Sequence, residues 1–168
     1  MCGGLRFKIP DSTTAEMRQV FFPRPHAEIP ILDEGDTRLV QWGKRAGEDP
    51  EIHVPQTGWA RESSLKSDYW QQYQPTLHLI PGLEFAEKGQ LKKSRWFPLP
   101  ASVYLLGLKI EKAGKNFVYV VTNPALGALE KIHPRMPLLV DAQMQPMEID
   151  LDFATPSPSP DNEQLRLL

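Results

Sequence analysis

Short runs of apolar or alternating apolar and polar residues, bounded by turn residues, predict strands along most of this chain. Six segments have this pattern: residues 38–43, 76–80, 102–110, 117–122, 137–140 and 147–151. Between the third and fourth lies Ala113-Gly114-Lys115, in a polar stretch that favours a hairpin turn. The hydrophobic pattern therefore predicts a strand-rich protein.

Three helices are predicted where apolar residues recur at helical spacing. The first begins at a capping box, Thr13 to Glu16, the second covers residues 59–73, and the third has Asn123 as its cap and Pro124 at its first position. Pro134 ends the third helix. Their expected apolar faces are Met17, Val20 and Phe21; Leu65, Tyr69 and Trp70; and Ala125, Leu126, Leu129 and Ile132.

Two segments show neither the strand pattern nor the helical pattern. Residues 44–58 are rich in Gly, Pro and acidic side chains and predict a long loop, and such loops in compact domains are often functional. From residue 154 onward, repeated Ser-Pro pairs predict a disordered, partly polyproline linker. We therefore expect a single strand-rich α+β domain over residues 1–152, with a few short helices, followed by a flexible tail over residues 153–168.

Composition fits an ordinary globular domain. The chain has 168 residues, of which 40% are hydrophobic and 24% charged. No apolar run approaches the roughly 18 residues that a membrane-spanning helix needs, and the N-terminus does not resemble a secretory signal. We expect a cytoplasmic, nucleoid-associated protein with no membrane partner, no cofactor and no metal.

Charge is distributed unevenly. The net charge is −2, but five of the 21 acidic residues and one of the 19 basic residues lie in residues 148–168. The rest of the chain carries 16 acids and 18 bases, a net charge of about +2. This balance permits a nucleic-acid-binding surface without requiring one.

The single cysteine, Cys2, is the first candidate for chemistry. It excludes an intrachain disulfide and fits a reducing compartment. Aminopeptidases remove Met1 when a small residue follows, which would leave an N-terminal amine and a thiol on one residue. These groups titrate near ~7.7–8.0 and ~8.5, so both are partly nucleophilic at neutral pH. Together they condense with an aldehyde to a thiazolidine, and Gly3 and Gly4 allow a substrate to approach closely.

Six short segments occur in an order that resembles the SRAP (SOS-response-associated peptidase) family. They are Met1-Cys2-Gly3-Gly4, Trp42-Gly43, Ala60-Arg61-Glu62, Pro81-Gly82-Leu83-Glu84, Thr122-Asn123-Pro124-Ala125 and Ile132-His133-Pro134-Arg135-Met136-Pro137. The resemblance covers roughly residues 1–140. Ile-His-x-Arg-Met-Pro, with a Thr eleven residues before the His, is its most specific part. It implies an SRAP-like fold, a thiazolidine crosslink to abasic sites in single-stranded DNA, and a peptidase activity that removes residues ahead of the cysteine.

The resemblance also implies roles for individual residues. Cys2 is the nucleophile, and His133 handles protons during imine formation and sugar ring opening, a task suited to imidazole. Glu84 is the expected catalytic glutamate, with Glu87 as the second choice, because matching Glu84 requires a one-residue deletion. Two simpler interpretations remain open: His133 caps a helix C-terminus, and Glu84 is an exposed strand residue.

Further residues are expected to contact DNA. Arg61 matches an arginine that holds a phosphate, and Thr122 orients the histidine or binds phosphate. Trp42 either stacks on a base or is buried. The basic residues Lys88, Lys92, Lys93 and Arg95, together with Trp96, either follow the DNA backbone or form a solvated hairpin loop.

The chain departs from the family at the abasic sugar. The family places an asparagine just before Ala-Arg, where this chain has Trp59, which we expect to face the DNA. A second asparagine is missing from the Pro-rich loop at residues 22–26, where Arg24 or His26 is the candidate replacement. These differences indicate a compact, divergent member, as expected of a phage or prophage copy.

The C-terminal residues Gln164-Leu165-Arg166-Leu167-Leu168 resemble the Gln-Leu-x-Leu-Phe peptides that bind the bacterial sliding clamp. This similarity suggests recruitment to replication forks, where abasic single strands occur. The hypothesis is independent of the chemistry at Cys2.

Three other functions fit parts of the sequence. Class II glutamine amidotransferases also begin Met-Cys-Gly and use an N-terminal cysteine, but their Arg-Gly-Pro-Asp and Asn-Gly-Glu segments are absent. A degenerate SRAP-like protein would bind single-stranded DNA without crosslinking. A self-processing peptidase would cleave its own leader without any dependence on DNA.

Overall fold

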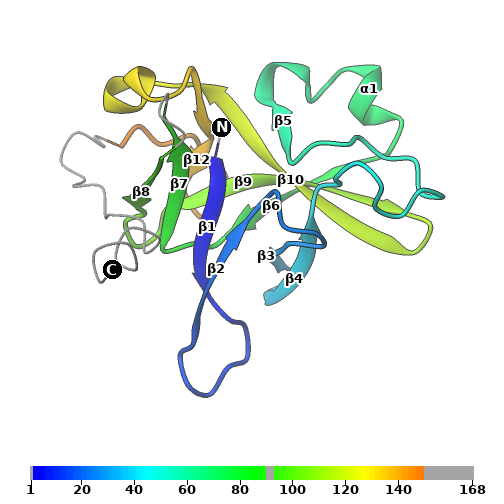
Figure 1. Ribbon diagram of the computed structural model, residues 1–168, viewed down its shortest axis with the longest axis horizontal. Helices are drawn as coiled ribbons and strands as arrows, with labels where there is room; N and C mark the ends of the chain where they lie inside the picture. The colour runs from blue at the N-terminus through cyan, green and yellow to red at the C-terminus, as the bar shows by residue number, and fades with distance from the viewer. Residues whose placement is uncertain (1, 90–92, 150–168) are drawn as a thin grey trace, which may run out of the picture.

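Two β-sheets pack around a shared hydrophobic core in the computed structural model, which describes residues 2–89 and 93–149 (Figure 1). The first sheet has the strand order β2-β1-β7-β8, and all its pairs are antiparallel. Its strands are β1 (Cys2–Lys8), β2 (Met17–Phe21), β7 (Glu84–Lys88) and β8 (Ser94–Pro98). Strand β1 therefore lies inside this sheet, between β2 and β7.

The second sheet is larger and mixed. Its main path runs β12-β9-β10-β4-β3, with β5 and β11 paired to β10 and β6 paired to β9. Strand β10 pairs in parallel with both β4 and β5. The strands are β3 (Glu28–Asp33), β4 (Asp36–Trp42), β5 (Trp59–Arg61), β6 (Thr76–Ile80), β9 (Tyr104–Lys112), β10 (Lys115–Pro124), β11 (Arg135–Pro137) and β12 (Leu139–Val140).

The long strand β10 is buried on both faces, which explains its continuous apolar sequence. Val118 and Val120 face the core shared with the first sheet, and Phe117, Tyr119 and Val121 face a second core. Residues from the segment before β6 cover that second core, including Ile52, Val54 and Trp70. The hydroxyl of the buried Tyr119 donates a hydrogen bond to the carbonyl of Pro55, at 3.0 Å.

The strand predictions are largely confirmed. Residues 76–80 are β6, and residues 38–43, 102–110 and 117–122 fall mostly within β4, β9 and β10. The hairpin turn is also confirmed, since Ala113 and Gly114 both have positive φ, 52° and 74°, as a tight primed turn requires. Residues 137–140 are divided between β11 and β12. Residues 147–149 are not a strand, and the predicted tail lies outside the described residues.

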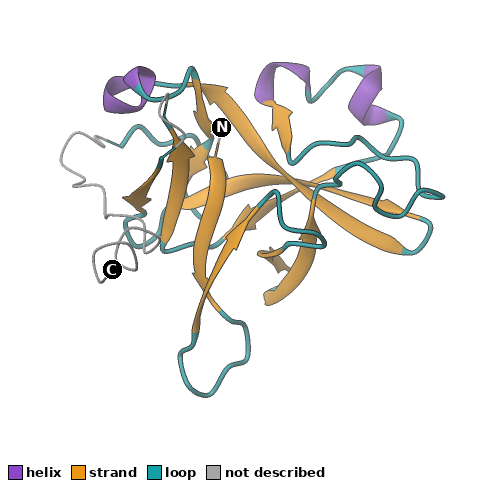
Figure 2. Ribbon diagram, viewed as in Figure 1, coloured by secondary structure: helices purple, strands orange, loops and turns teal. Residues whose placement is uncertain are grey.

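The first helix prediction is wrong, and the second and third are confirmed only as short helical turns. In the described part of the chain the α-helical structure is the four-residue α1 (Asp68–Gln71), with 3-10 helices η1 (Glu62–Ser64) and η2 (Gly127–Lys131) (Figure 2). Residues 17–21 form β2, because pairing with β1 along five residues satisfies their main chain. Residues 59–61 form β5, and Asn123 and Pro124 end β10. Pro124 is tolerated there because it stands at a strand end, where a missing N–H costs little.

The protein is thus a strand-rich single domain, with less helix than the α+β prediction implied. Within residues 2–89 and 93–149, no helix is long and apolar enough to cross a membrane. Residues 44–58 form the predicted loop, made of turns and bends between β4 and β5.

Candidate functional site

Cys2 begins strand β1 and is fully buried. Its Sγ lies 3.3 Å from the carbonyl oxygen of Gly4, to which the thiol donates a hydrogen bond. Burial raises the pKa of the thiol well above its ordinary value, and the nearby charge of Glu87 raises it further. The thiol is therefore protonated at neutral pH in this conformation, and any reaction requires that it lose a proton to a neighbour.

A register shift in β1 determines which side chain lies opposite Cys2. From Gly4 to Arg6 the pairing with β7 is regular, with Gly4 opposite Ala86, but Cys2 lies opposite Glu87 instead of Lys88. Two residues of β1 therefore match one of β7, with Gly3 as the extra residue, which is a β-bulge. Bulges of this kind change the direction in which side chains point and are frequent next to active sites.

Glu87, not Glu84, is the carboxyl that the fold brings to Cys2. Glu87 is fully buried, and this burial raises its pKa to about 7, although the positive α-amino group of the chain lowers it. Glu84 lies three residues away and so points to the other face of β7. There it lies opposite Arg6 and forms an ion pair with the Arg6 guanidinium at 2.7 Å. The second choice of the sequence prediction thus has the better position.

His133 follows η2 and is partly buried. Its main-chain N–H donates to the carbonyl of Leu129, and its Nδ1 lies 3.1 Å from both the N–H and the carbonyl oxygen of Arg135. Burial lowers the pKa of His133, and the charge of the chain's α-amino group lowers it further. No hydrogen bond joins His133 to Cys2 among the residues that the structure describes.

Trp59 contacts the main chain of Cys2. Its indole Nε1 donates a hydrogen bond to the Cys2 carbonyl oxygen at 2.8 Å. The ring packs against Phe22, with 4.6 Å between ring centroids, and against Trp42, at 6.4 Å. Trp42 itself is fully buried, and its Nε1 donates to the carbonyl of Gly58. The expectation that Trp42 stacks on a base is therefore wrong for this conformation, and of the two only Trp59 is partly exposed.

Two arginines lie near each other beside the end of β10. Arg61 on β5 lies opposite Thr122, and Arg135 on β11 donates to Thr122 through its side chain, at 3.0 Å to Oγ1 and 2.7 Å to the carbonyl. Burial lowers the pKa of Arg135, and the positive charge of Arg61 lowers it further. Thr122 is thus bound to Arg135 and not to His133. The nearby carboxylate of Glu62 acts in the opposite direction and raises the pKa of Arg135.

Sequence reasoning gave Arg135 no role, although it belongs to the Ile-His-x-Arg-Met-Pro motif. Its place in that motif is the sequence feature that could have identified Arg135 as a functional residue.

Among the basic residues near the β7–β8 connection, Lys93 and Arg95 are exposed, and Arg95 lies opposite Glu87 in the register of β8. Lys92 lies outside the described residues. Exposed lysines and arginines fit both the DNA-backbone interpretation and the solvated loop.

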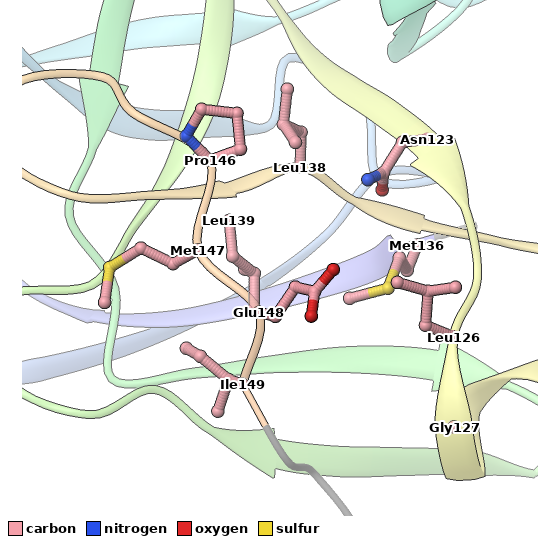
Figure 3. A pocket seen from close by; sticks show the side chains of 10 residues that line it. All are labelled: Asn123, Leu126, Gly127, Met136, Leu138, Leu139, Pro146, Met147, Glu148 and Ile149. Atoms are coloured by element: carbon pink, nitrogen blue, oxygen red, sulfur yellow. The ribbon is translucent and has the colours of Figure 1, made fainter.

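A cavity of about 430 Å³ lies between β10, β11, β12 and residues 146–149 (Figure 3). Leu126, Met136 and Leu139 contribute apolar walls, and the side chains of Asn123 and Glu148 extend toward its interior (Figure 3). Neither Cys2 nor His133 lines it. Among the described side chains, no group of three or more potential ligands is arranged to hold a metal ion.

Comparison with models of known protein families gives no match, and neither does comparison with curated protein sequences. The candidate site is therefore defined by its geometry: Cys2, Glu87 and Trp59 meet at the N-terminal end of β1. The strand β5 connects this site to the arginine pair, because it contains both Trp59 and Arg61.

Proposed function

We propose that this protein crosslinks to abasic sites in single-stranded DNA through Cys2, after loss of Met1, as an SRAP-like protein. The observation that carries the proposal is the bulged pairing of Cys2 with Glu87, a buried carboxyl with a pKa of about 7. A carboxyl with this pKa both gives and accepts protons at neutral pH. Glu87 lies opposite Cys2, which carries both an amine and a thiol once Met1 is removed.

The first step is condensation of the freed Cys2 amine with the aldehyde of the ring-opened abasic sugar. The amine nitrogen bonds to the C1′ carbon, and the carbinolamine then loses water to give an imine. The leaving hydroxyl needs one proton, which the protonated Glu87 carboxyl supplies. Before it attacks, the amine gives up its ammonium proton to His133, whose lowered pKa keeps its imidazole neutral; after the addition one N–H proton moves to the alkoxide to complete the carbinolamine hydroxyl.

The second step closes the ring. The protonated imine is a cation next to the Cys2 thiol, and such a charge lowers the pKa of the thiol that burial had raised. The thiol gives its proton to the Glu87 carboxylate, the sulfur bonds to C1′, and the electron pair of the C=N bond moves to nitrogen. The net reaction converts an aldehyde and an aminothiol into a thiazolidine and one water.

The arginine pair accounts for binding of the DNA backbone. Arg61 and Arg135 present two guanidinium groups, each able to bind a phosphate through two hydrogen bonds. Burial is the main cause of the lowered pKa of Arg135; repulsion from Arg61 lowers it further, although the Glu62 carboxylate acts in the opposite direction. We propose that a backbone phosphate next to the lesion relieves this repulsion and positions the abasic sugar near Cys2.

The test is crosslinking to a single-stranded oligonucleotide with one abasic site. Protein whose intact mass confirms loss of Met1 should give a slow, protease-sensitive band on a denaturing gel. An oligonucleotide with a tetrahydrofuran abasic analogue is the matched control, because it lacks the aldehyde. A band of equal intensity with this analogue, or no band with the natural site, would refute the proposal.

Variants then assign the residues. Cys2→Ala should abolish the stable adduct, and Cys2→Ser should leave only an imine that borohydride traps. Glu87→Gln and Glu84→Gln distinguish the two carboxyl candidates: Glu87→Gln should slow ring closure, and a slowing by Glu84→Gln alone would restore the first choice. A variant with extra residues ahead of Cys2 tests the peptidase activity. This variant should remove the extra residues, and the same variant with Cys2→Ala should not.

A further inference from the structure

The indole of Trp59 bonds to the main chain of the residue that is proposed to react. The donor is Nε1, the acceptor is the Cys2 carbonyl oxygen, and the two atoms are 2.8 Å apart. Trp59 comes from β5 in the second sheet, whereas Cys2 begins β1 in the first. The hydrogen bond therefore joins the two sheets at the start of β1.

This bond has a particular consequence once Met1 is absent. Cys2 is then a chain terminus, and terminal residues fray unless their main chain is held. The direction of the amine relative to the carbonyl depends on one main-chain torsion, ψ of Cys2. With the carbonyl held by Trp59 and the rest of β1 paired on both sides, this torsion is fixed, and so is the position of the amine.

We infer that Trp59 is a positioning residue, which holds the N-terminal residue so that its amine and thiol reach one aldehyde carbon. The inference rests on the proposed function, and it gives a role to the residue that stands where the resembled family has asparagine. An asparagine at this position of the family contacts the sugar. Trp59 acts on the protein side of the reaction, through the nucleophile.

The surroundings of Trp59 suit this role. Phe22 packs against its ring, with centroids 4.6 Å apart, and Trp42 contacts its edge at an interplanar angle of 78°. Trp42 is in turn fixed by the hydrogen bond to the Gly58 carbonyl. An aromatic ring held on two sides loses little entropy when it orients a partner, so the indole N–H is preorganised toward Cys2.

The experiment compares Trp59→Phe with Trp70→Phe. Both variants keep an aromatic ring and lose one indole hydrogen bond, but Trp70 belongs to the second core and its hydrogen bond goes to Ser64 Oγ. Trp59→Phe should lower the single-turnover crosslinking rate constant at saturating abasic DNA by about tenfold, as expected when an oriented group loses one hydrogen bond. Trp70→Phe should stay within about twofold of the wild-type rate.

A spectroscopic readout tests the hydrogen bond without DNA. Because the chain has a single cysteine, growth on cysteine labelled with ¹³C at the carbonyl gives one protein resonance, that of Cys2. Trp59→Phe should move this resonance upfield, and Trp70→Phe should not. If Trp59→Phe does not fold, hydrogen exchange of the Trp59 indole in the Met1-free wild type decides, and exchange as fast as in a free indole overturns the inference.

The outcomes separate the inference from the proposed function. Equal crosslinking rates in the wild type and Trp59→Phe overturn the positioning role and leave the crosslinking function intact. If neither protein crosslinks, the proposed function fails. Thiazolidine formation with free 2-deoxyribose then decides the positioning role, with slower reaction of Trp59→Phe supporting it and equal rates overturning it.

Discussion

Replacing Glu87 by Gln should change how the stability of the protein depends on pH. Glu87 is fully buried beside Cys2, and burial raises its pKa from 4.5 to about 7. A raised carboxyl pKa means that the folded state favours the protonated side chain. Glutamine has nearly the same shape, stays neutral and does not titrate, so the variant imitates protonated Glu87 at every pH.

The sign and size follow from linkage. Below pH 4.5, Glu87 is protonated in both the folded and unfolded states. As pH rises to about 7, the unfolded state ionises first, and the stability contributed by the neutral side chain is lost until the folded state also ionises. A pKa of about 7 in the folded state, against 4.5, corresponds to a loss of about 3 kcal/mol in the free energy of unfolding.

Urea denaturation at a series of pH values from about 4.5 to 8.5 measures this effect, with ΔG extrapolated linearly to zero denaturant. The lowered pKa of His133 acts in the opposite direction, because a depressed histidine pKa adds stability above its unfolded value. Since both proteins contain His133, its effect cancels in the difference between them. Glu87→Gln should therefore gain about 3 kcal/mol relative to wild type across this range. Parallel curves would refute the assignment of a raised pKa to Glu87.

Three further predictions concern binding, packing and recruitment. Arg135→Gln should weaken binding to single-stranded DNA and reduce the slope of log K against log salt by about 0.7, as expected for one lost phosphate contact, measured by fluorescence anisotropy at several salt concentrations. Gly43→Ala should cost more than about 3 kcal/mol in urea denaturation, because φ is +53° and the new Cβ overlaps the Thr57 carbonyl oxygen; Gly114→Ala, at φ +74° with open space, should cost only about 1 kcal/mol. A sliding-clamp pull-down should capture the full chain and lose it when residues 163–168 are removed; equal capture of both would end the clamp hypothesis.

The strands were predictable where burial itself produces the sequence pattern. Strand β10 has a core on each face, so its apolar run is continuous, and the Ala113-Gly114 turn that precedes it requires positive φ at both positions. The first predicted helix failed for the opposite reason. Met17, Val20 and Phe21 satisfy helical spacing over a single turn, which is too short to outweigh five residues of pairing with β1.

Much of the candidate site was proposed from local motifs, and its role stays a prediction. Cys2, His133 and Arg61 each stand in a short sequence segment that carries a chemical meaning. Trp59 and Arg135 were harder, since their roles depend on contacts between distant segments: the Trp59 indole with the Cys2 carbonyl, and the Arg135 guanidinium with Arg61. No spacing along the chain predicts either contact.

The choice between Glu84 and Glu87 depended on a single extra residue. In regular antiparallel pairing, the register that places Gly4 opposite Ala86 would place Cys2 opposite Lys88. The bulge at Gly3 moves the pairing by one position and puts the buried carboxyl of Glu87 there instead. Gly4 has a different reason to be glycine, because a Cβ on it would lie 2.9 Å from the Phe21 ring. The two glycines that first suggested room for a substrate thus set the strand register and the packing behind the proposed nucleophile, and this register is what gives Cys2 its carboxyl partner.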